Sequence, residues 1–283
     1  MTPSAPGGQI VSIERRPIYY LDIGQGTPVV LLHGGGPGAS GYSNYHRNIQ
    51  GLQTQYRLII PDLPGYGRSG KAPIDGPRYA AYAAAVLGLL DHLKIPKAHF
   101  VGNSLGGGAA LKSALEAPQR VDKLVLMGPA GLVSAYTKVP TEGARRIFEY
   151  YGGDGPSREK LKAFIQLLIY DSSTLTEQLL EERYQASIDP EVLANPPLGR
   201  GQVPVLEELW RDARLGQLKQ ETLVLWGRED RVNPLYTAEI LMNQLPNAMM
   251  VSFTRCGHWV QWERAAAFDS LLSSFLRGGA PAA

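Results

Sequence analysis

The pentapeptide Gly102-Asn103-Ser104-Leu105-Gly106 is the part of the sequence whose spacing most clearly suggests chemistry. It follows an apolar run that ends at Val101, and a run of small residues typical of a helix, 107–115, comes after it. A G-x-S-x-G sequence between a strand and a helix forms a tight turn that exposes the serine hydroxyl at the helix N-terminus. We therefore predict that Ser104 is a nucleophile rather than part of a turn without chemistry.

A base and an acid must accompany such a serine. The base removes the hydroxyl proton and the acid orients the base. Where this turn is used, the chain order is serine, acid, histidine. Of the five histidines, only His258 follows Ser104, so we predict that it is the base. Glu229 and Asp230 both follow the apolar run 222–226, and we favour Asp230 as the acid with Glu229 as the alternative.

Two backbone N–H groups should receive the oxyanion that forms during attack. One belongs to the residue after the nucleophile, Leu105. The other is expected in the glycine-rich loop 33–38, where glycines allow close approach to a substrate, and Gly35 is our choice. We expect His33 to hold this loop in shape, and Asp62 in the next such loop to be structural.

Arg183, which lies in the segment between Ser104 and Asp230, indicates the charge of the substrate. In the helical stretch 176–188, Leu179 and Leu180 lie four and three residues before it, so it shares their apolar face. An arginine on an inward face needs an anionic partner, which can be a protein group or a ligand. We favour a substrate carboxylate, with a salt bridge within the protein or a guanidinium that reaches solvent as alternatives.

Short apolar runs bounded by turn residues indicate the strands that position these loops. Residues 10–23 alternate as an opening hairpin would, with a turn at 24–26. The later runs are typical of strands buried on both faces of a parallel sheet. They are residues 28–32, 56–60, 98–101, 123–127, 222–226 and 249–253. Helical patterns at 83–93 and 268–276 alternate with them, which predicts a mostly parallel α/β sheet flanked by helices.

The stretch from about 133 to 215 interrupts this alternation. It contains helical segments and Pro/Gly-rich breaks but no strand pattern, and it is too long for a loop. We therefore predict a first core segment at 1–132, an inserted helical cap at 133–214 and a second core segment at 215–283. The last residues, RGGAPAA, are expected to be disordered.

Composition excludes several classes of partner. The 283 residues are 44% apolar, enough for a large core, and carry a net charge of +2 without a block of one sign, so we expect no nucleic-acid partner. No apolar run approaches the ~20 residues needed to span a bilayer, and the first residues lack the pattern of a signal peptide. The single cysteine, Cys256, cannot form an internal disulfide. We expect a cytoplasmic protein that acts on a small molecule without a metal or cofactor and has no membrane partner.

With these residues in hand, the sequence resembles the meta-cleavage-product hydrolases of the α/β-hydrolase superfamily. These enzymes split carbon–carbon bonds in the breakdown of aromatic rings. The matching segments span nearly the whole chain and include both loops of the predicted triad. They are HGGGPGASGYSNYHRNI (33–49), VGNSLGGG (101–108), LVLMGPAGL (124–132), LIYDSSTLTEQLLEERY (168–184), WGREDRVNPL (226–235) and CGHWVQWE (256–263).

The resemblance implies an acidic substrate, a 2-hydroxy-6-oxo-hexa-2,4-dienoate. It implies that Asn103 and Arg183 hold the carboxylate and 2-oxo end and stabilise the negative charge that develops there. It also implies that Trp259 lines the pocket beside the base. Leu168 falls where some relatives have phenylalanine, which leaves the pocket for the 6-substituent open. The aliphatic residues Leu132, Val133, Leu168 and Ile169 suggest only that this pocket is apolar. The residues so assigned to substrate binding are Gly34, Asn44, Asn103, Leu168, Arg183 and Trp259. Relatives assemble into dimers or larger oligomers, so a homo-oligomer is expected by analogy.

The implied reaction explains why a catalytic triad alone would not be enough and why residues that bind the dienoate end of the substrate are needed as well. A carbanion is a poor leaving group unless an electron sink forms first. The expected sequence is ketonisation of the dienol with protonation at C5, assisted by His258, then attack at C6 and cleavage. Ser104 could form an acyl-enzyme or activate water towards a gem-diol, and the intact turn favours the acyl-enzyme.

Three other functions share parts of this pattern. A carboxylesterase uses the same triad, and an aminopeptidase acting on N-terminal proline uses a similar glycine loop. The aminopeptidase needs carboxylates in the cap to bind an amine, whereas Arg183 suits an acid. A non-catalytic ligand receptor on the same scaffold is a third alternative, since some receptors keep an intact triad.

Overall fold

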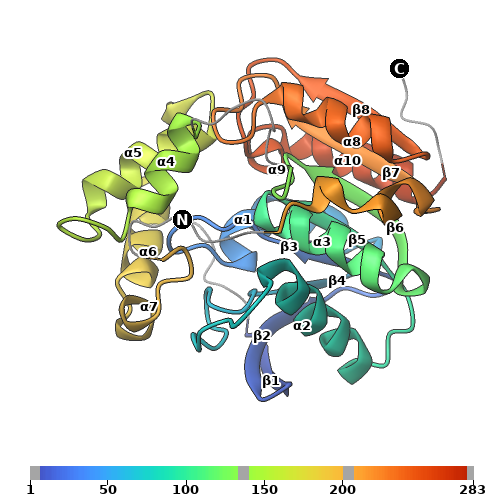
Figure 1. Ribbon diagram of the computed structural model, residues 1–283, viewed down its shortest axis with the longest axis horizontal. Helices are drawn as coiled ribbons and strands as arrows, with labels where there is room; N and C mark the ends of the chain where they lie inside the picture. Colours follow the sequence, from blue (N-terminus) through green and yellow to red (C-terminus); the bar gives the residue numbers. More distant parts are fainter. Residues whose placement is uncertain (1–6, 133–139, 200–206, 279–283) are drawn as a thin grey trace.

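A central sheet of eight strands organises the molecule (Figure 1). The structure is a computed structural model that describes residues 7–132, 140–199 and 207–278. The strands lie in the order β1-β2-β4-β3-β5-β6-β7-β8, with β1 and β2 antiparallel to their neighbours and the others parallel. The strands are β1 Gln9–Ile13, β2 Arg16–Ile23, β3 Thr27–Leu32, β4 Tyr56–Pro61, β5 Ala98–Asn103, β6 Val121–Met127, β7 Thr222–Gly227 and β8 Ala248–Phe253.

The predicted strands after the hairpin agree with β3 to β8 to within two residues at each end. The prediction of burial on both faces holds for β5 and β7, in which every residue is buried. It is wrong for β8, where Met249 and Met250 are 38% and 39% exposed. β8 is the last strand of the sheet, and an edge strand has only one neighbour to cover it.

The opening hairpin is present, but its turn is not where we expected it. β1 and β2 pair around Glu14 and Arg15, which both adopt positive φ angles, 48° and 66°. Two such residues form the tight turn that suits a hairpin, but Asn and Gly are the usual sequence signal for it. The predicted turn at 24–26 instead leads from β2 to β3, which are separated in the sheet by β4.

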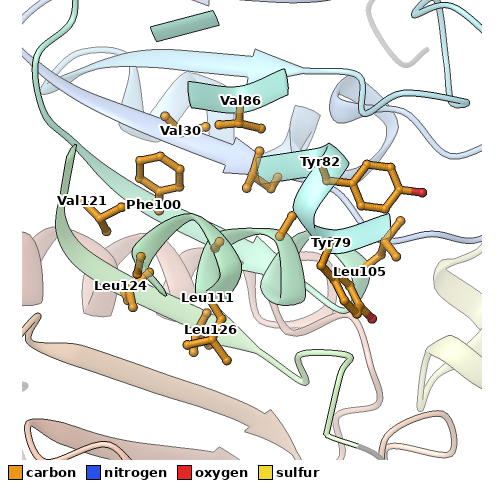
Figure 2. Close-up of a cluster of buried hydrophobic side chains, with 14 of the residues drawn as sticks. Val30, Tyr79, Tyr82, Val86, Phe100, Leu105, Leu111, Val121, Leu124 and Leu126 are labelled. Atoms are coloured by element: carbon orange, nitrogen blue, oxygen red, sulfur yellow. The ribbon is translucent and has the colours of Figure 1, made fainter. Parts of the chain in front are cut away.

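Helices cover both faces of the sheet. On one face, α2, α3 and α8 pack on a cluster that includes Phe100 and Leu126, and Figure 2 shows side chains of α2 and α3 converging on strand residues there. On the other face, α1, α9 and α10 contribute to a second cluster. These helices are α1 Gly41–Leu52, α2 Arg78–His92, α3 Leu105–Glu116, α8 Ala238–Gln244, α9 Val260–Glu263 and α10 Ala265–Leu276.

Between β6 and β7 the described chain forms helices and no strand, as predicted. The helices are α4 Glu142–Glu149, α5 Arg158–Leu168, α6 Glu177–Ser187 and α7 Pro190–Ala194. They stand together to one side of the sheet (Figure 1) and share a third apolar cluster with Val232 and Trp259 of the core. We call α4 to α7 the cap.

The exact division of the chain at 132 and 214 stays a prediction. Residues 133–139, where the cap was expected to begin, lie outside the described residues. Near the expected end, Leu209 already packs in the first core cluster. Of the tail expected to be disordered, residues 279–283 also lie outside the described residues.

Candidate active site

Ser104 stands at the sharp turn between β5 and α3. Its backbone has φ 53° and ψ −117°, a strained conformation for a residue with a side chain. A Cβ added at Gly102 would collide with the carbonyl of Gly106, and one at Gly106 with the carbonyl of Leu32. Both flanking positions therefore require glycine, which is the steric reason for the G-x-S-x-G pattern. The turn places Ser104 at the start of a helix, as predicted from the motif.

His258 and Asp230 form a buried hydrogen-bonded pair. The distance from His258 Nδ1 to Asp230 Oδ2 is 2.7 Å, and the two side chains are 2% and 1% exposed. Asp230 Oδ1 accepts from the backbone N–H groups of Val232 and Asn233 at 2.8 and 2.9 Å. With both oxygens occupied, the carboxylate has one orientation, and it fixes the imidazole so that Nε2 is left for another partner.

His258 and Ser104 line the same small cavity, although no hydrogen bond joins the serine hydroxyl to the ring. Such bonds are often long without substrate and tighten in the complex. Glu229, the alternative acid, points elsewhere, because its Oε2 accepts from the backbone N–H of Cys256 at 3.0 Å. The Cys256 thiol is fully buried, and burial raises its pKa far above its usual range. The arrangement thus favours Asp230 over Glu229 and leaves Cys256 unreactive.

The glycine loop lies against the start of α3. An added Cβ on Gly35 would approach Leu105 Cβ to 3.2 Å, so the two expected oxyanion donors are neighbours. Within the described part of the chain, neither backbone N–H has a hydrogen-bond partner. The Tyr66 hydroxyl donates to the Gly35 carbonyl at 3.0 Å, which helps to hold the loop that carries the Gly35 N–H. These N–H groups are therefore available to a substrate oxygen.

His33 and Asp62 shape the loops around this position. The backbone N–H of Leu63 donates to His33 Nε2 at 2.9 Å, and His33 Nδ1 lies 2.8 Å from the Gly34 carbonyl. Burial lowers the pKa of His33 to about 4, so the ring is neutral and Nδ1 is the donor. The Asp62 carboxylate accepts from the N–H groups of Gly41 and Arg68, both at 2.7 Å. Both residues link loops and lie outside the cavity beside Ser104, as predicted.

Arg183, on α6, reaches from the cap to the glycine loop. Its side chain is 1% exposed, and Nε and Nη2 donate to the Pro37 carbonyl at 3.0 and 2.7 Å. Buried Nη1 has no partner, and no carboxylate of the described residues lies within 4.0 Å of the guanidinium. Burial lowers its pKa to about 10, so it remains a cation at neutral pH. Neither alternative for Arg183, a salt bridge within the protein or a solvated head, occurs in the described residues.

Asn103 is buried in the same cavity wall, but its orientation differs from the expected one. Its Nδ2 donates to the carbonyls of Met127 and His258 at 3.2 and 3.0 Å, which uses both hydrogens. Buried Oδ1 has no partner. Asn103 therefore presents an acceptor to the cavity, where we expected a donor to a developing negative charge. Sequence alone could not show this, because the two carbonyls that set the amide come from distant segments.

The other expected substrate contacts also surround this cavity. Asn44 is bonded within the protein, since its Oδ1 accepts from the Gly34 N–H at 3.2 Å and its Nδ2 donates to the Ser40 carbonyl. Trp259 packs beneath the guanidinium of Arg183, 5.2 Å from ring centroid to Cζ. Leu168 contributes from the cap. The cavity measures about 20 Å³, room for one water molecule, and its lining includes Gly34, Asn44, Asn103, Ser104, Phe164, Leu168, Arg183, His258 and Trp259.

A second, larger cavity of about 170 Å³ opens on the other side of Ser104. Its walls are mostly apolar and include Leu132, Ile147, Phe148, Leu198 and Val232. Leu132 was expected there, but Val133 lies outside the described residues. Leu168 and Ile169 were also expected to line an apolar pocket, yet Leu168 lines the smaller cavity and Ile169 lines neither. Ser104 and Gly35 belong to both cavities, so the nucleophile stands at their junction.

Sequence reasoning missed several residues of the site. Phe164 lines the smaller cavity one helical turn before Leu168, and the apolar stripe of α5 was the signal that could have revealed it. Tyr66 was missed because nothing near it in sequence marks a tyrosine that orients a peptide 31 residues away. The described residues contain no group of three or more His, Cys, Asp and Glu side chains arranged to hold a metal ion.

Comparison with known proteins agrees with this geometry. The α/β-hydrolase fold family matches residues 27–265. The chain is 45% identical over 267 residues to 2-hydroxy-6-oxo-6-phenylhexa-2,4-dienoate hydrolase of Burkholderia cepacia, covering 93% of this chain and 92% of that one. It is 43% identical to 2-hydroxy-6-oxononadienedioate/2-hydroxy-6-oxononatrienedioate hydrolase of Comamonas testosteroni, covering 93% and 92%.

A solved structure shows the same likeness in three dimensions. The meta-cleavage product hydrolase of Pseudomonas fluorescens superposes with a TM-score of 0.85 at 34% identity, covering 95% of this chain and 97% of that one. The fold of this chain is the one that these relatives share. The chain belongs to the meta-cleavage-product hydrolase family of the α/β-hydrolase fold.

Proposed function

We propose that the protein hydrolyses the C5–C6 bond of a 2-hydroxy-6-oxo-hexa-2,4-dienoate to 2-hydroxypenta-2,4-dienoate and a carboxylic acid. The observation that carries this proposal is the buried Arg183 cation, whose Nη1 has no partner in a cavity that also contains Ser104. An unpaired buried charge is costly, and a substrate carboxylate would pair with it. Named relatives act on substrates that carry such a carboxylate.

The proposed binding places the acid end of the substrate in the smaller cavity. The carboxylate pairs with Arg183, and the enol hydroxyl at C2 donates to the free Oδ1 of Asn103. The dienoate then extends towards Ser104, so that C6 lies at the junction with the larger cavity. Because the smaller cavity now has room for little more than one water molecule, its walls must move apart to admit the dienoate.

The reaction begins with a proton transfer. The C2 hydroxyl loses its proton, C5 gains one, and His258 is the carrier, so that the dienol becomes a ketone with a saturated C5. Ser104 Oγ then attacks C6 while His258 takes its proton, and the Gly35 and Leu105 N–H groups receive the oxyanion. The C5–C6 bond breaks with its electrons drawn into the 2-oxo group, and the resulting dienolate takes the proton held by His258 to give 2-hydroxypenta-2,4-dienoate. His258 then removes a proton from water, which attacks the acyl-serine and releases the carboxylic acid while Ser104 regains its proton.

The larger cavity supports an apolar 6-substituent. Engineered cavities of about 150 Å³ bind benzene, so a space of about 170 Å³ walled by aliphatic and aromatic side chains suits a phenyl ring or a short alkyl chain. The two relatives differ in this part of their substrates, since one name specifies a phenyl group and the other a second acid group. We therefore propose at least 10-fold higher kcat/KM for a phenyl dienoate than for one ending in a carboxylate.

A bleaching assay tests the proposed reaction. Dienoates of this class are coloured anions, and loss of colour together with release of the expected acid, identified by chromatography, would support the proposal. The alternatives are tested in parallel with p-nitrophenyl acetate and a prolyl p-nitroanilide. Rapid ester or amide hydrolysis with no cleavage of phenyl- or methyl-substituted dienoates would contradict it. Binding of dienoates without turnover would favour a receptor.

Location and assembly also remain proposals. No helix in the described part of the chain is long and apolar enough to cross a membrane. The free, buried Cys256 is compatible with a reducing cytoplasm. The uncharged edge strand β8, with exposed Met249 and Met250, supports self-association, because an unprotected strand edge can pair with another strand. Size-exclusion chromatography with light scattering would measure the assembly, and a monomer at micromolar concentration would contradict it.

A further inference from the structure

The chain leaving α5 in the cap lies directly against the loop that carries His258. The carbonyl of Leu168, the last residue of α5, accepts from the backbone N–H groups of His258 and Trp259 at 2.7 and 3.2 Å. Gly257 is packed so tightly there that an added Cβ would lie 2.7 Å from the same carbonyl. The backbone of the candidate base is thus held by the cap and not only by the core.

Glu263, at the end of α9, joins these two segments a second time. Its Oε1 accepts from the backbone N–H groups of Tyr170 and Asp171 at 2.7 and 3.2 Å. Its Oε2 accepts from the backbone N–H of Gly257 at 2.6 Å. One carboxylate therefore receives three N–H groups, two from the cap and one from the loop of His258. Hydrogen bonds to an ionised acceptor are about twice as strong as neutral ones.

The loop of the candidate acid is attached to the same cap segment. Arg231, next to Asp230, donates through Nη2 to the carbonyls of Gln166 and Ile169. Residues 166–171 of the cap are therefore fastened to both the acid loop and the base loop. Of the side chains that make these contacts, only Glu263 bonds to the cap and to the base loop at once.

We propose that Glu263 is a positioning residue that sets His258 and the cap wall of the dienoate cavity in one arrangement. Because Leu168 supplies both a wall of that cavity and the carbonyl that holds His258, a shift of residues 166–171 displaces the base and reshapes the cavity together. A misplacement of about 1 Å costs on the order of 100-fold in rate. This proposal rests on the proposed function where it is tested by dienoate hydrolysis. Its test by hydrolysis of a simple ester does not depend on that function.

The test uses Glu263→Gln in the full-length protein. The amide keeps the size of the side chain, but its NH₂ group must face an N–H donor on one side, so one set of contacts is lost. Glu239→Gln makes the same change at an exposed position on α8 and is the matched control. We expect kcat for the dienoate to fall about 10- to 100-fold and its KM to rise, because the cavity wall shifts with the base, and kcat for p-nitrophenyl acetate to fall about 10-fold. Glu239→Gln should match the wild type.

A merely structural role would lower the melting temperature and leave kcat at 25 °C unchanged on both substrates, and that result would overturn the proposal. Glu263→Asp keeps the charge on a shorter arm and should retain more kcat than Glu263→Gln. If Glu263→Gln does not fold, the proposal is tested instead by the kinetics of Glu263→Asp and by hydrogen exchange in the wild type. The amides of Gly257, Tyr170 and Asp171 should exchange at similar rates, and a difference above about 100-fold would refute the link. Failure of the wild type to cleave any dienoate would refute the proposed function alone.

Discussion

The candidate acid–base pair of the core and the buried arginine of the cap differ in how completely their polar groups are paired. In the core, Asp230 has partners on both oxygens and His258 is held through its ring and its backbone. In the cap, Arg183 is equally buried but keeps one donor unpaired. A group whose hydrogen bonds are all made is already held in its working orientation before substrate binds. A buried charge with an unused donor is costly, and a ligand of opposite charge would stabilise it. In the proposed function, the paired groups of the core carry out the reaction and the unpaired cation of the cap binds the acid end of the substrate.

The first prediction concerns the core and has the largest expected effect. Ser104→Ala should lower kcat for acid release from a phenyl dienoate by at least about 10⁴-fold, because Ser104 is the proposed nucleophile at C6. The variant should still bleach the dienoate slowly, since His258 carries the ketonisation proton without Ser104. Chromatography of the products separates the two steps. Normal acid release by Ser104→Ala would exclude the serine as nucleophile.

Substitution of Arg183 tests the cap half. Arg183→Gln should lower kcat/KM for dienoates by about 10²- to 10³-fold, because a buried carboxylate would lose its charged partner. Turnover of p-nitrophenyl acetate, which has no carboxylate, should stay within about 3-fold of the wild type. Steady-state kinetics with both substrates measures the contrast. Equal loss on both would mean that Arg183 supports the structure and does not select the substrate.

Filling the larger cavity should have a more modest effect. Leu198→Trp adds volume to a wall of that cavity without touching the smaller one. We expect kcat/KM for a phenyl-substituted dienoate to fall about 10-fold, while a methyl-substituted dienoate is cleaved as well as before. The ratio of the two rates is the measurement. An unchanged ratio would place the 6-substituent elsewhere.

The last prediction concerns stability and pH in the core loops and leaves the choice of substrate untouched. The pKa of His33 falls from 6.5 to about 4 on burial, so its contribution to stability is present above pH 6.5 and is lost as pH falls towards 4. That loss is about 3 kcal/mol, and Asp62, whose pKa is raised to about 6, opposes it by stabilising the fold at low pH. The free energies of unfolding of wild type and His33→Gln, measured with denaturant between pH 7 and 4, should converge as pH falls. Parallel curves would contradict this account.

Much of the core half was predictable because its signals are local. The tight turn requires glycine at positions 102 and 106, so five consecutive residues are enough to recognise it. The chain order of serine, acid and histidine left His258 as the only candidate base. Buried strands appear as apolar runs, so their positions were predicted to within two residues. The turn at Glu14 and Arg15 was not, because neither residue carries the usual signal for positive φ.

The sequence by itself was enough to predict the family, the chain order of the loops that carry the candidate triad, and Ser104 and His258 as candidate nucleophile and base. Only the tertiary structure decided between Asp230 and Glu229, which are adjacent in sequence but point to different partners. It also showed that Arg183 has no anionic partner among the described residues, that Asn103 offers an acceptor, and that Glu263 joins the cap to the loop of His258. Each of these depends on hydrogen bonds between segments far apart in the chain, and no local pattern encodes where such partners meet.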